Sequence, residues 1–337
     1  MKTFNPELYR GNIIISRIRL ARNVAGLPFR IRDGAVADKV IKEAYYALKK
    51  TEPFDLFKMK GLSEVKKEAL KERHLISRNL IENEEFGAAI INRDESVSVM
   101  INEEDVIREQ CFMRGFRLDE AYKKINFLDD ALSKRLEFAF DDELGYLTAC
   151  PTNLGTGMRA SVMMFLPALT ESGKIEALYR EVSERGLTIR GVYGEGSKAE
   201  GYNYQISNEI TLGAKEEEIV KEVGDTVERI CLLERDETER LYGDNEIKTI
   251  DRVKRAYGIL TNAFLLTYKE FLSLAGDVKL GAMLGYINIA DVEKLDELTL
   301  SVRPANLIEQ YGDNMTETEC DIYRAEVVAK ILARIKE

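Results

Sequence analysis

Residues 150–159 read Cys-Pro-Thr-Asn-Leu-Gly-Thr-Gly-Met-Arg, and no other segment of the 337-residue chain is as informative about the fold. A cysteine at the end of an expected strand leads into a glycine-containing turn, and Arg159 begins the next strand. The ordinary role of a lone free cysteine is buried packing. A thiol that precedes exposed backbone amides and lies near arginines is instead expected to be a reactive thiolate, and the glycines let backbone N–H groups approach phosphate oxygens. The segment alone leaves both interpretations open.

The sequence on either side of this segment predicts two structural units. Two β-rich runs, 87–91 and 96–101, are separated by a polar stretch and predict a hairpin. Helical periodicity dominates from about residue 245 onward. Further strands are expected at 146–150, 159–166, 187–192 and 204–211, and helices at 40–48, 118–136, 175–184 and 219–230. We therefore expect an α+β unit over residues 1–245 and an all-helical unit over residues 246–337.

Composition and charge exclude several classes of function. Lys plus Arg number 49 and Asp plus Glu number 59, so the net charge is −10 and a general basic surface for nucleic acid is excluded. The single histidine, His74, and four widely spaced cysteines form no CxxC or HExxH pattern, which argues against a metal site made by this chain and against a Ser-His-Asp enzyme. The longest apolar stretch, 161–169, is too short to cross a membrane. Scattered cysteines without a signal peptide predict reduced thiols and a cytoplasmic location.

The first basic motif is Ser16-Arg-Ile-Arg-Leu-Ala-Arg-Asn23. Side chains two residues apart in a strand point to the same face, so Arg17 and Arg19 are expected to stand side by side. A solvated basic edge is one interpretation. The other is a phosphate clamp, because guanidinium groups match phosphate oxygens and adjacent like charges need an anion to share.

Two acidic segments are candidates for the binding of a cationic or protic substrate. Asn102-Glu-Glu-Asp105 ends an apolar strand and is followed by Arg108. Arg190-Gly-Val-Tyr-Gly-Glu-Gly196 places Glu195 between glycines, which indicates a sharply turned or mobile loop. Solvation of ordinary loops explains such residues equally well. The functional interpretation is that one carboxylate from each segment faces a cleft.

Taken together and in this order, these motifs and Ile206-Ser-Asn208 resemble the catalytic domain of the ATP:guanidino phosphotransferases, the phosphagen kinases, over about residues 10–245. Arginine and creatine kinases carry a helical domain before the Ser-x-Arg-x-Arg strand, whereas only fifteen residues precede Ser16 here. The helical unit instead follows the catalytic domain, an arrangement similar to that of the bacterial protein-arginine kinases. The resemblance implies an antiparallel β-sheet flanked by helices, followed by an all-α C-terminal domain.

The resemblance also implies roles for single residues. Glu104 and Glu195 would grip the acceptor guanidinium and accept its proton, and Cys150 would lie beside it as a thiolate. Mg²⁺ would be held by the phosphates of ATP and by water rather than by a dedicated protein site. The residues implied to surround the nucleotide are Arg17, Arg19, Arg108, Arg159 and Arg190 at the phosphates, with His74 near the adenine.

Two positions depart from the family pattern. Val106 stands where the family commonly has His, and we expect altered packing or nucleotide affinity rather than loss of activity. In the C-terminal unit, Cys320 replaces the first arginine of an Arg-Asp-x-x-Arg-Ala motif that binds phosphoarginine in protein-arginine kinases. Asp321 and Arg324 are retained as candidates for part of such a pocket. An amphipathic helix in a dimer interface is the alternative for this segment.

The function expected from the resemblance is ATP-dependent phosphorylation of arginine side chains in proteins. The implied partners are protein substrates with accessible arginines, among them a heat-shock transcription repressor, a zinc-containing activator protein, a Clp-type ATPase and a second copy of the chain. This implies a role in the stress response and in marking proteins for proteolysis. A phosphagen kinase for free arginine or another small guanidine, and a non-catalytic phosphoarginine-binding adaptor, are the alternatives.

Overall fold

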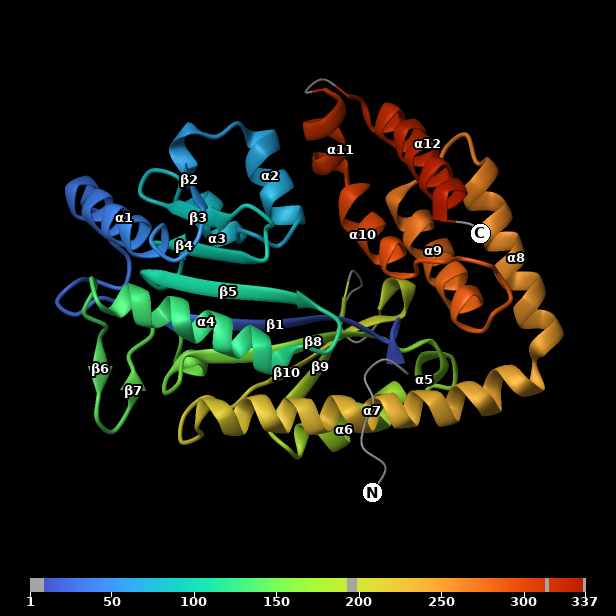
Figure 1. Cartoon of the computed structure of the whole chain (residues 1–337), viewed down its shortest axis with the longest axis horizontal. Helices are drawn as coiled ribbons and strands as arrows, with labels where there is room; N and C mark the ends of the chain where they lie inside the picture. The colour runs from blue at the N-terminus through green and yellow to red at the C-terminus, as the bar shows by residue number, and fades with distance from the viewer. Residues whose placement is uncertain (1–8, 193–198, 313–314, 336–337) are drawn as a thin grey trace. The chain divides into compact units, whose positions relative to one another are not determined.

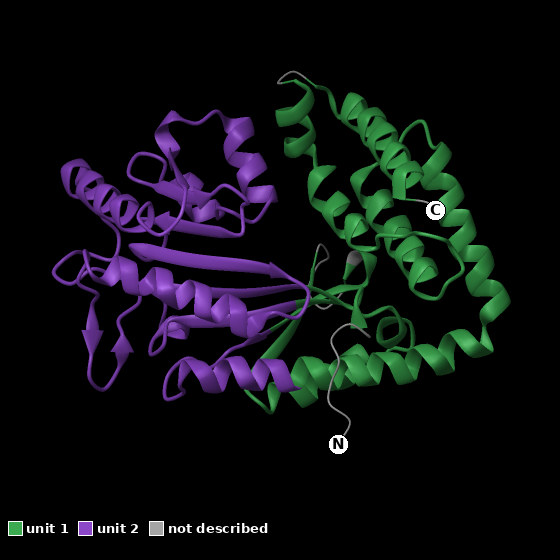
Figure 2. Cartoon of the chain, in the orientation of Figure 1, with its two compact units in different colours: residues 1–14, 163–206, 226–337 green, residues 15–162, 207–225 purple. Residues whose placement is uncertain are grey.

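The computed structural model describes residues 9–192, 199–312 and 315–335. The chain forms two compact units, one of residues 1–14, 163–206 and 226–337 and the other of residues 15–162 and 207–225 (Figure 2). We call them the first unit and the second unit. Strands β1, β8 and β10 and helix α7 run through both units.

The strands, labelled in Figure 1, are β1 (Ile13–Arg22), β2 (Phe54–Lys58), β3 (Ala88–Asn92), β4 (Val97–Ile101), β5 (Ile107–Arg114), β6 (Phe140–Asp141), β7 (Gly145–Tyr146), β8 (Met158–Phe165), β9 (Leu187–Gly191) and β10 (Asn203–Asn208). The α-helices are α1 (Gly34–Leu48), α2 (Glu64–Glu72), α3 (Arg78–Glu82), α4 (Leu118–Ser133), α5 (Pro167–Glu171), α6 (Ile175–Ser183), α7 (Glu216–Asp244), α8 (Glu246–Asn262), α9 (Tyr268–Met283), α10 (Glu293–Ser301), α11 (Pro304–Tyr311) and α12 (Glu317–Ile335).

Eight strands form one sheet in the order β2-β3-β4-β5-β1-β8-β10-β9, and β6 pairs with β7 in a separate two-stranded ribbon. The neighbours from β2 to β1 are antiparallel. The family expectation of an antiparallel sheet flanked by helices is therefore confirmed. Strand β1 lies inside the sheet and pairs with β5 so that Arg19 faces Gln110 and Ala21 faces Arg108. The basic strand and the strand that follows the acidic run are thus direct neighbours.

Periodicity in the sequence explains most elements of the second unit. Helix α4 buries Leu118, Ala121, Ile125, Leu128 and Leu132, the stripe expected for a helix with one buried face. It packs on β5. The predicted hairpin is present as β3 and β4, both of which are buried throughout. Helices α2 and α3 cover these strands through a cluster that includes Leu70, Leu80 and Met100.

One predicted strand is wrong. The structure has only Gly145–Tyr146 as strand β7, and residues 147–150 are irregular. Leu147 N donates to Ala139 O (3.0 Å), whereas Ala149 N donates to the carboxylate of Asp105 (2.6 Å). A side chain takes the place of a neighbouring strand, so the ladder ends before Cys150. The strand predicted at 204–211 is likewise shorter and ends at Asn208.

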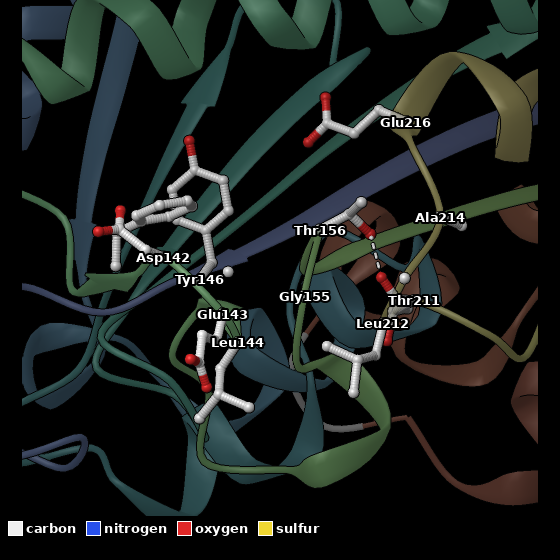
Figure 3. Close-up of a pocket in the computed structure, with 13 residues that line it drawn as sticks. Asp142, Glu143, Leu144, Tyr146, Gly155, Thr156, Thr211, Leu212, Ala214 and Glu216 are labelled. Atoms are coloured by element: carbon white, nitrogen blue, oxygen red, sulfur yellow. Dashed lines mark hydrogen bonds between the residues drawn. The ribbon is translucent and has the colours of Figure 1, made fainter.

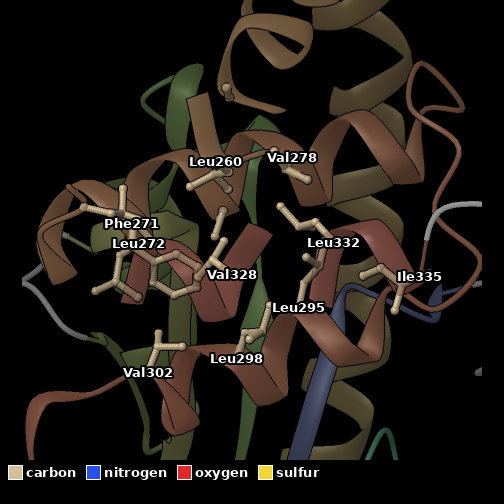
Figure 4. Packing of buried hydrophobic residues seen from close by; sticks show 14 of the residues in the cluster. Leu260, Phe271, Leu272, Val278, Leu295, Leu298, Val302, Val328, Leu332 and Ile335 are labelled. Carbon is tan, nitrogen blue, oxygen red and sulfur yellow. The ribbon is translucent and has the colours of Figure 1, made fainter. Parts of the chain in front are cut away.

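The helical part of the first unit has its own hydrophobic core. Helices α8, α9, α10 and α12 contribute the cluster drawn in Figure 4, with Leu260, Phe271, Val278, Leu298 and Val328 nearly inaccessible to solvent. The prediction of an all-helical segment after residue 245 is confirmed for the described residues. Across the described ranges, no helix combines the length and apolar character needed to span a bilayer.

Candidate active site

Four arginines of the second unit form a cationic cluster on one face of the sheet. Arg17 and Arg19 alternate along β1 with the buried Ile18 and Leu20, as the period of a strand requires. Arg108 is on the adjacent β5, and Arg159 is the second residue of β8. The expectation that Arg17 and Arg19 share a face is met by this alternation.

Burial and mutual repulsion lower the pKa values of two arginines in the cluster. Burial lowers the pKa of Arg17 to about 9, with the charges of Arg108 and Arg159 adding to the effect. Burial, followed by repulsion from Arg108, Arg17 and Arg159, lowers the pKa of Arg19 well below its ordinary value. Arg17 Nε and Arg108 Nε are buried and have no hydrogen-bond partner among the described residues. Unpaired guanidinium donors that crowd each other are suited to binding a polyanion.

His74 is linked to this cluster through Gln110. Gln110 Nε2 donates to His74 O (2.8 Å), and Gln110 Oε1 accepts from Arg17 Nη2 (2.6 Å). The guanidinium of Arg17 also lies over the ring of Phe112, 5.1 Å from its centroid. His74 has φ of 61°, an uncommon value for a residue other than glycine, and follows α2. The side chain of Gln110 therefore bridges the backbone of His74 and the guanidinium of Arg17.

The acidic run turns out to contain three carboxylates with different environments. Glu103 is buried and accepts hydrogen bonds from Arg108 Nη1 (2.8 Å) and from the Ser77 hydroxyl. Burial opposes its ionisation, but the charge of Arg108 and these hydrogen bonds bring the pKa of Glu103 below its ordinary value. Glu104 is exposed as a residue. Partial desolvation of its carboxyl, together with the negative charges of Asp105 and Glu103, raises the pKa of Glu104. Glu104 is thus the carboxylate available to a ligand.

Asp105 ties the Glu104 segment to the cysteine segment. It is 2% exposed, and its Oδ1 accepts from Ala149 N (2.6 Å) and from Asn23 Nδ2 (2.7 Å). Asn23 completes the link, because its Nδ2 also donates to Leu147 O (2.9 Å) and its Oδ1 accepts from Val106 N (2.8 Å). The end of β1, the acidic run and the approach to Cys150 therefore form one hydrogen-bonded assembly, which we call the Asn23–Asp105 staple.

Cys150 is half-buried at the start of a 3₁₀ turn, Pro151–Asn153. Its Sγ lies 3.0 Å from Thr152 Oγ1. The other three cysteines, Cys111, Cys231 and Cys320, are buried. Cys150 is the one thiol among the four that solvent and a substrate can reach.

The glycines of this segment are required by close backbone contacts. Gly155 has φ of +104°, and a Cβ there would lie 2.4 Å from Thr211 O. Gly157 has φ of +64°, and a Cβ would lie 2.5 Å from Ala21 O. Both conformations and both distances exclude side chains. This packing role differs from the approach to phosphate that the sequence suggests, and it fixes the segment against β1.

Arg22 holds the same segment from the other side. It is 1% exposed, it forms an ion pair with Asp129 (3.0 Å), and its Nη1 donates to Thr156 O (2.8 Å). Its guanidinium lies 3.6 Å from the ring centroid of Tyr146. Sequence reasoning missed Arg22, Asn23 and Asp105 as positioning residues. Two of them stand in the quoted basic motif and one in the acidic run, but only their burial distinguishes them from the ligand-facing residues.

The remaining predicted residues lie elsewhere in the chain. Arg190 is exposed near the end of β9 in the first unit, and Glu195 lies outside the described residues. Arg324 on α12 is 1% exposed; its Nε donates to Val302 O (2.9 Å), its Nη1 donates to Leu266 O (2.8 Å), and it pairs with Asp321. In this structure Arg324 stabilises the helical core, so its role in binding phosphoarginine stays a prediction.

The second unit combines the arginine cluster, which is suited to an anion, with the accessible carboxylate of Glu104 and the accessible thiol of Cys150. The Asn23–Asp105 staple links the segments that carry Glu104 and Cys150. The arginines suit a polyphosphate, and Glu104 suits a cationic group that must lose a proton. Among the described residues, no group of three or more His, Cys, Asp or Glu side chains could hold a metal ion. The arrangement suits transfer of a phosphoryl group from a polyphosphate to a cationic acceptor.

Comparisons with known proteins agree with this chemistry. A family model described as ATP:guanido phosphotransferase, C-terminal catalytic domain, matches residues 36–237, and one described as protein-arginine kinase McsB C-terminal domain matches residues 246–337. The chain is 43% identical over 323 residues to a protein-arginine kinase of Caldanaerobacter subterraneus subsp. tengcongensis, covering 94% of this chain and 96% of that protein. It is 41% identical over 327 residues to a protein-arginine kinase of Syntrophomonas wolfei subsp. wolfei, covering 95% and 91%.

Solved structures of similar fold include a taurocyamine kinase and a lombricine kinase. The duplicated taurocyamine kinase of Schistosoma mansoni with bound transition-state analogue components has a TM-score of 0.61 and 25% identity. The match covers 81% of this chain and 40% of that one. A lombricine kinase structure has a TM-score of 0.59 and 24% identity, covers 66% of each chain, and supports the fold alone.

Proposed function

The chain belongs to the ATP:guanido phosphotransferase family, in its protein-arginine kinase branch, and we propose that it transfers the γ-phosphoryl group of ATP to arginine side chains of proteins. The observation that carries this proposal from the structure is the pairing of the arginine cluster on β1, β5 and β8 with the exposed Glu104, which lies in the turn between β4 and β5 and interacts electrostatically with Arg108 and Arg19. The two features correspond to the two substrates, a polyphosphate and a guanidinium.

In the proposed reaction, a guanidino nitrogen attacks the γ-phosphorus, an N–P bond forms, and the P–O bond to ADP breaks. A guanidinium has a pKa above about 12 and is not nucleophilic until it loses a proton. Glu104 accepts that proton and aligns the nitrogen, so positioning and general-base catalysis are one task. The raised pKa of Glu104 makes it a stronger base than an ordinary surface glutamate. Glu195 is proposed as the second carboxylate on the strength of the sequence motif alone.

We propose that Arg17, Arg19, Arg108 and Arg159 bind the phosphates and that Arg190 joins them. Their charges balance the negative charge that spreads over the transferring group. Glu103 positions Arg108 through its buried ion pair. Mg²⁺ is proposed to arrive with ATP, held by phosphate oxygens and water, and to shield phosphate charge. His74 is proposed at the adenine end, next to Gln110.

Mass spectrometry under non-acidic conditions tests the function, since the N–P bond is acid-labile. An arginine-containing protein and free arginine are incubated separately with Mg-ATP and the wild-type chain, Glu104→Gln or Asp55→Asn. Asp55 is an exposed carboxylate on β2 and is the matched control for loss of one charge. We expect phosphate on protein arginines with the wild type and the control, and at least 10²-fold less with Glu104→Gln. Phosphate on free arginine alone would support a small-guanidine kinase, and none on either would support an adaptor.

We propose a homodimer through the helical segment 246–337. This segment exposes Ile247 (83%), Phe264 (75%) and the stacked pair Tyr311 and Tyr323, whose ring centroids are 5.2 Å apart. A dimer interface on this segment would remove part of this apolar surface from water. Light scattering of the wild type and of Phe264→Ser tests the proposal, and a monomeric wild type would refute it.

The family resemblance alone supports the remaining partners: a heat-shock transcription repressor, a zinc-containing activator protein and a Clp ATPase. We propose these partners, a role in the stress response, and a domain boundary near residue 245, where one family model ends at 237 and the other begins at 246. A cytoplasmic location is proposed because the four cysteines form no disulfide and because the reaction needs ATP.

A further inference from the structure

A cavity of about 290 Å³ in the second unit adjoins the cysteine segment without including Cys150 or Glu104. One wall is the β6–β7 ribbon with Leu144, and the opposite wall is the segment 211–216 (Figure 3). Gly155, from the cysteine segment, lies between the two walls. The proposed reaction uses none of the side chains that line it.

The lining combines apolar surface with negative charge. Phe140 (58%), Leu144 (42%) and Leu212 (47%) are among the most exposed large apolar side chains of this unit. Asp142, Glu143 and Glu216 add three carboxylates, and no lysine or arginine lines the cavity.

The three carboxylates differ in whether they already have a partner within the protein. Glu216 pairs with Arg22 (3.4 Å) and accepts from the Tyr122 hydroxyl (3.1 Å). Asp142 and Glu143 are exposed, and no ion pair within the described ranges involves either side chain. Two unpaired negative charges beside exposed apolar walls complement a cation on an aliphatic stem.

We propose that this cavity binds a lysine or arginine side chain of the protein substrate, other than the arginine that is phosphorylated. The proposal rests on the proposed function and deepens it by naming the substrate class, segments with a second basic residue near the target. The aliphatic stem packs on Leu144 and Leu212, and the cationic end is attracted to Asp142 and Glu143. A single acidic surface residue would not discriminate in this way, because it offers no apolar contact to the stem.

Chain connectivity sets the spacing between the two basic residues. Gly155 follows Cys150 by five residues, which limits their separation to about 17 Å. Thr211 shortens this path, since its Oγ1 donates to Thr152 O (3.0 Å) and Leu154 O (2.7 Å). An extended peptide advances about 3.3–3.6 Å per residue. The second basic residue is therefore expected within about five residues of the target arginine.

A peptide series tests this inference. Each peptide has one arginine in a Gly/Ser/Ala background and one lysine, which is moved through positions up to about eight residues away on either side, beyond the ~5-residue reach. A peptide without lysine is the reference. The enzymes are the wild type, Asp142→Asn/Glu143→Gln, and the control Asp55→Asn/Asp119→Asn, which removes the same charge from two exposed carboxylates of the same unit outside the cavity.

We expect lysine within about five residues to raise kcat/KM of the wild type and the control roughly 3–10-fold over the reference, mostly through KM. The cavity variant should lose this gain and phosphorylate the reference peptide as the wild type does. An equal gain in the cavity variant, or an equal loss in the control, overturns the inference.

A binding measurement separates this inference from the proposed function. Fluorescence anisotropy with peptides in which citrulline replaces the target arginine reports on the cavity without phosphoryl transfer. A 3–10-fold weaker Kd for the lysine peptide in the cavity variant alone supports the inference even if no arginine is phosphorylated. An unchanged Kd overturns it even if the kinase activity is established.

Discussion

Asp105→Ala is expected to lower kcat without changing the affinity for ATP. The substitution removes the Asn23–Asp105 staple and leaves every proposed substrate-binding residue in place. The substitution deletes two hydrogen bonds to a carboxylate, from Ala149 N (2.6 Å) and Asn23 Nδ2 (2.7 Å). Asn23 Nδ2 keeps Leu147 O, whereas Ala149 N loses the acceptor that the carboxylate provides.

The magnitude follows from the nature of these bonds. Hydrogen bonds to charged groups contribute about 1.5–3 kcal/mol each. Burial raises the pKa of Asp105, so part of this gain is spent on desolvating the carboxylate. We expect the free energy of unfolding to fall by about 3 kcal/mol for Asp105→Ala and by about 1 kcal/mol for Asp105→Asn, which keeps an acceptor oxygen. Because displacement by about 1 Å can cost about 10²-fold in rate, kcat should fall by that order for the alanine variant.

The assay combines urea unfolding, nucleotide binding and arginine phosphorylation. The Kd for ATP should stay within about twofold, because the staple contains none of the arginines of the cluster. Asp94→Ala is the matched control, since Asp94 accepts from Ser96 N (3.1 Å) and Ser96 Oγ (2.7 Å) in the β3–β4 turn. It should cost stability and leave kcat unchanged. A kcat for Asp105→Ala equal to that of the wild type, with the expected loss of stability, would refute the idea that the staple aligns Glu104 with Cys150.

Three further predictions concern other parts of the chain. Burial raises the pKa of Glu234 from 4.5 to about 7, so the folded state holds a proton that the unfolded state releases, and this group should lower stability by up to about 3 kcal/mol as pH rises from about 4.5 to 7, at about 1.36 kcal/mol per pKa unit; urea unfolding across this range should show a slope in Glu234→Gln that is smaller than the wild-type slope by this amount, the rest coming from other buried carboxyls with raised pKa values, such as Glu109. Arg324→Ala should lower the free energy of unfolding by about 3–5 kcal/mol, because it breaks a buried pair with Asp321 and frees the carbonyls of Val302 and Leu266; thermal unfolding measures this, and a loss below about 1 kcal/mol would contradict it. Iodoacetamide should label Cys150 alone in the native protein, because Cys111, Cys231 and Cys320 are buried; peptide mapping that finds a second labelled cysteine at an equal rate would show that the core opens.

Local sequence patterns predict the regular elements well and their ends poorly. The α4 stripe and the β3–β4 hairpin follow from side-chain periodicity, which the chain itself records. The strand predicted at residues 146–150 fails because Asp105, more than forty residues away, takes the backbone N–H of Ala149. A hydrogen bond between a backbone N–H and a side chain so distant in sequence cannot be predicted from the local sequence pattern.

The same limit applies to the site. The family resemblance names Arg17, Arg19 and Glu104 as ligand-binding residues, but the residue pattern by itself does not separate them from Arg22, Glu103 and Asp105, which have the same chemistry and are buried. Partner identity decides the role: Arg22 pairs with Asp129, which stands 107 residues later. An acidic run in a sequence therefore names a site without saying which carboxylate serves it.

The alternation along β1 also has a consequence for mutagenesis of this strand. Along four consecutive residues, the side chains of Ile18 and Leu20 are buried and stabilise the fold. The alternate residues Arg17 and Arg19 are the ones proposed to bind the ligand. A library that randomises this strand should separate into two phenotypes with a period of two: variants that fail to accumulate in cells and variants that accumulate without activity. In such a library, substitutions at positions 18 and 20 are expected to affect mainly the stability of the sheet, and substitutions at positions 17 and 19 mainly ligand binding.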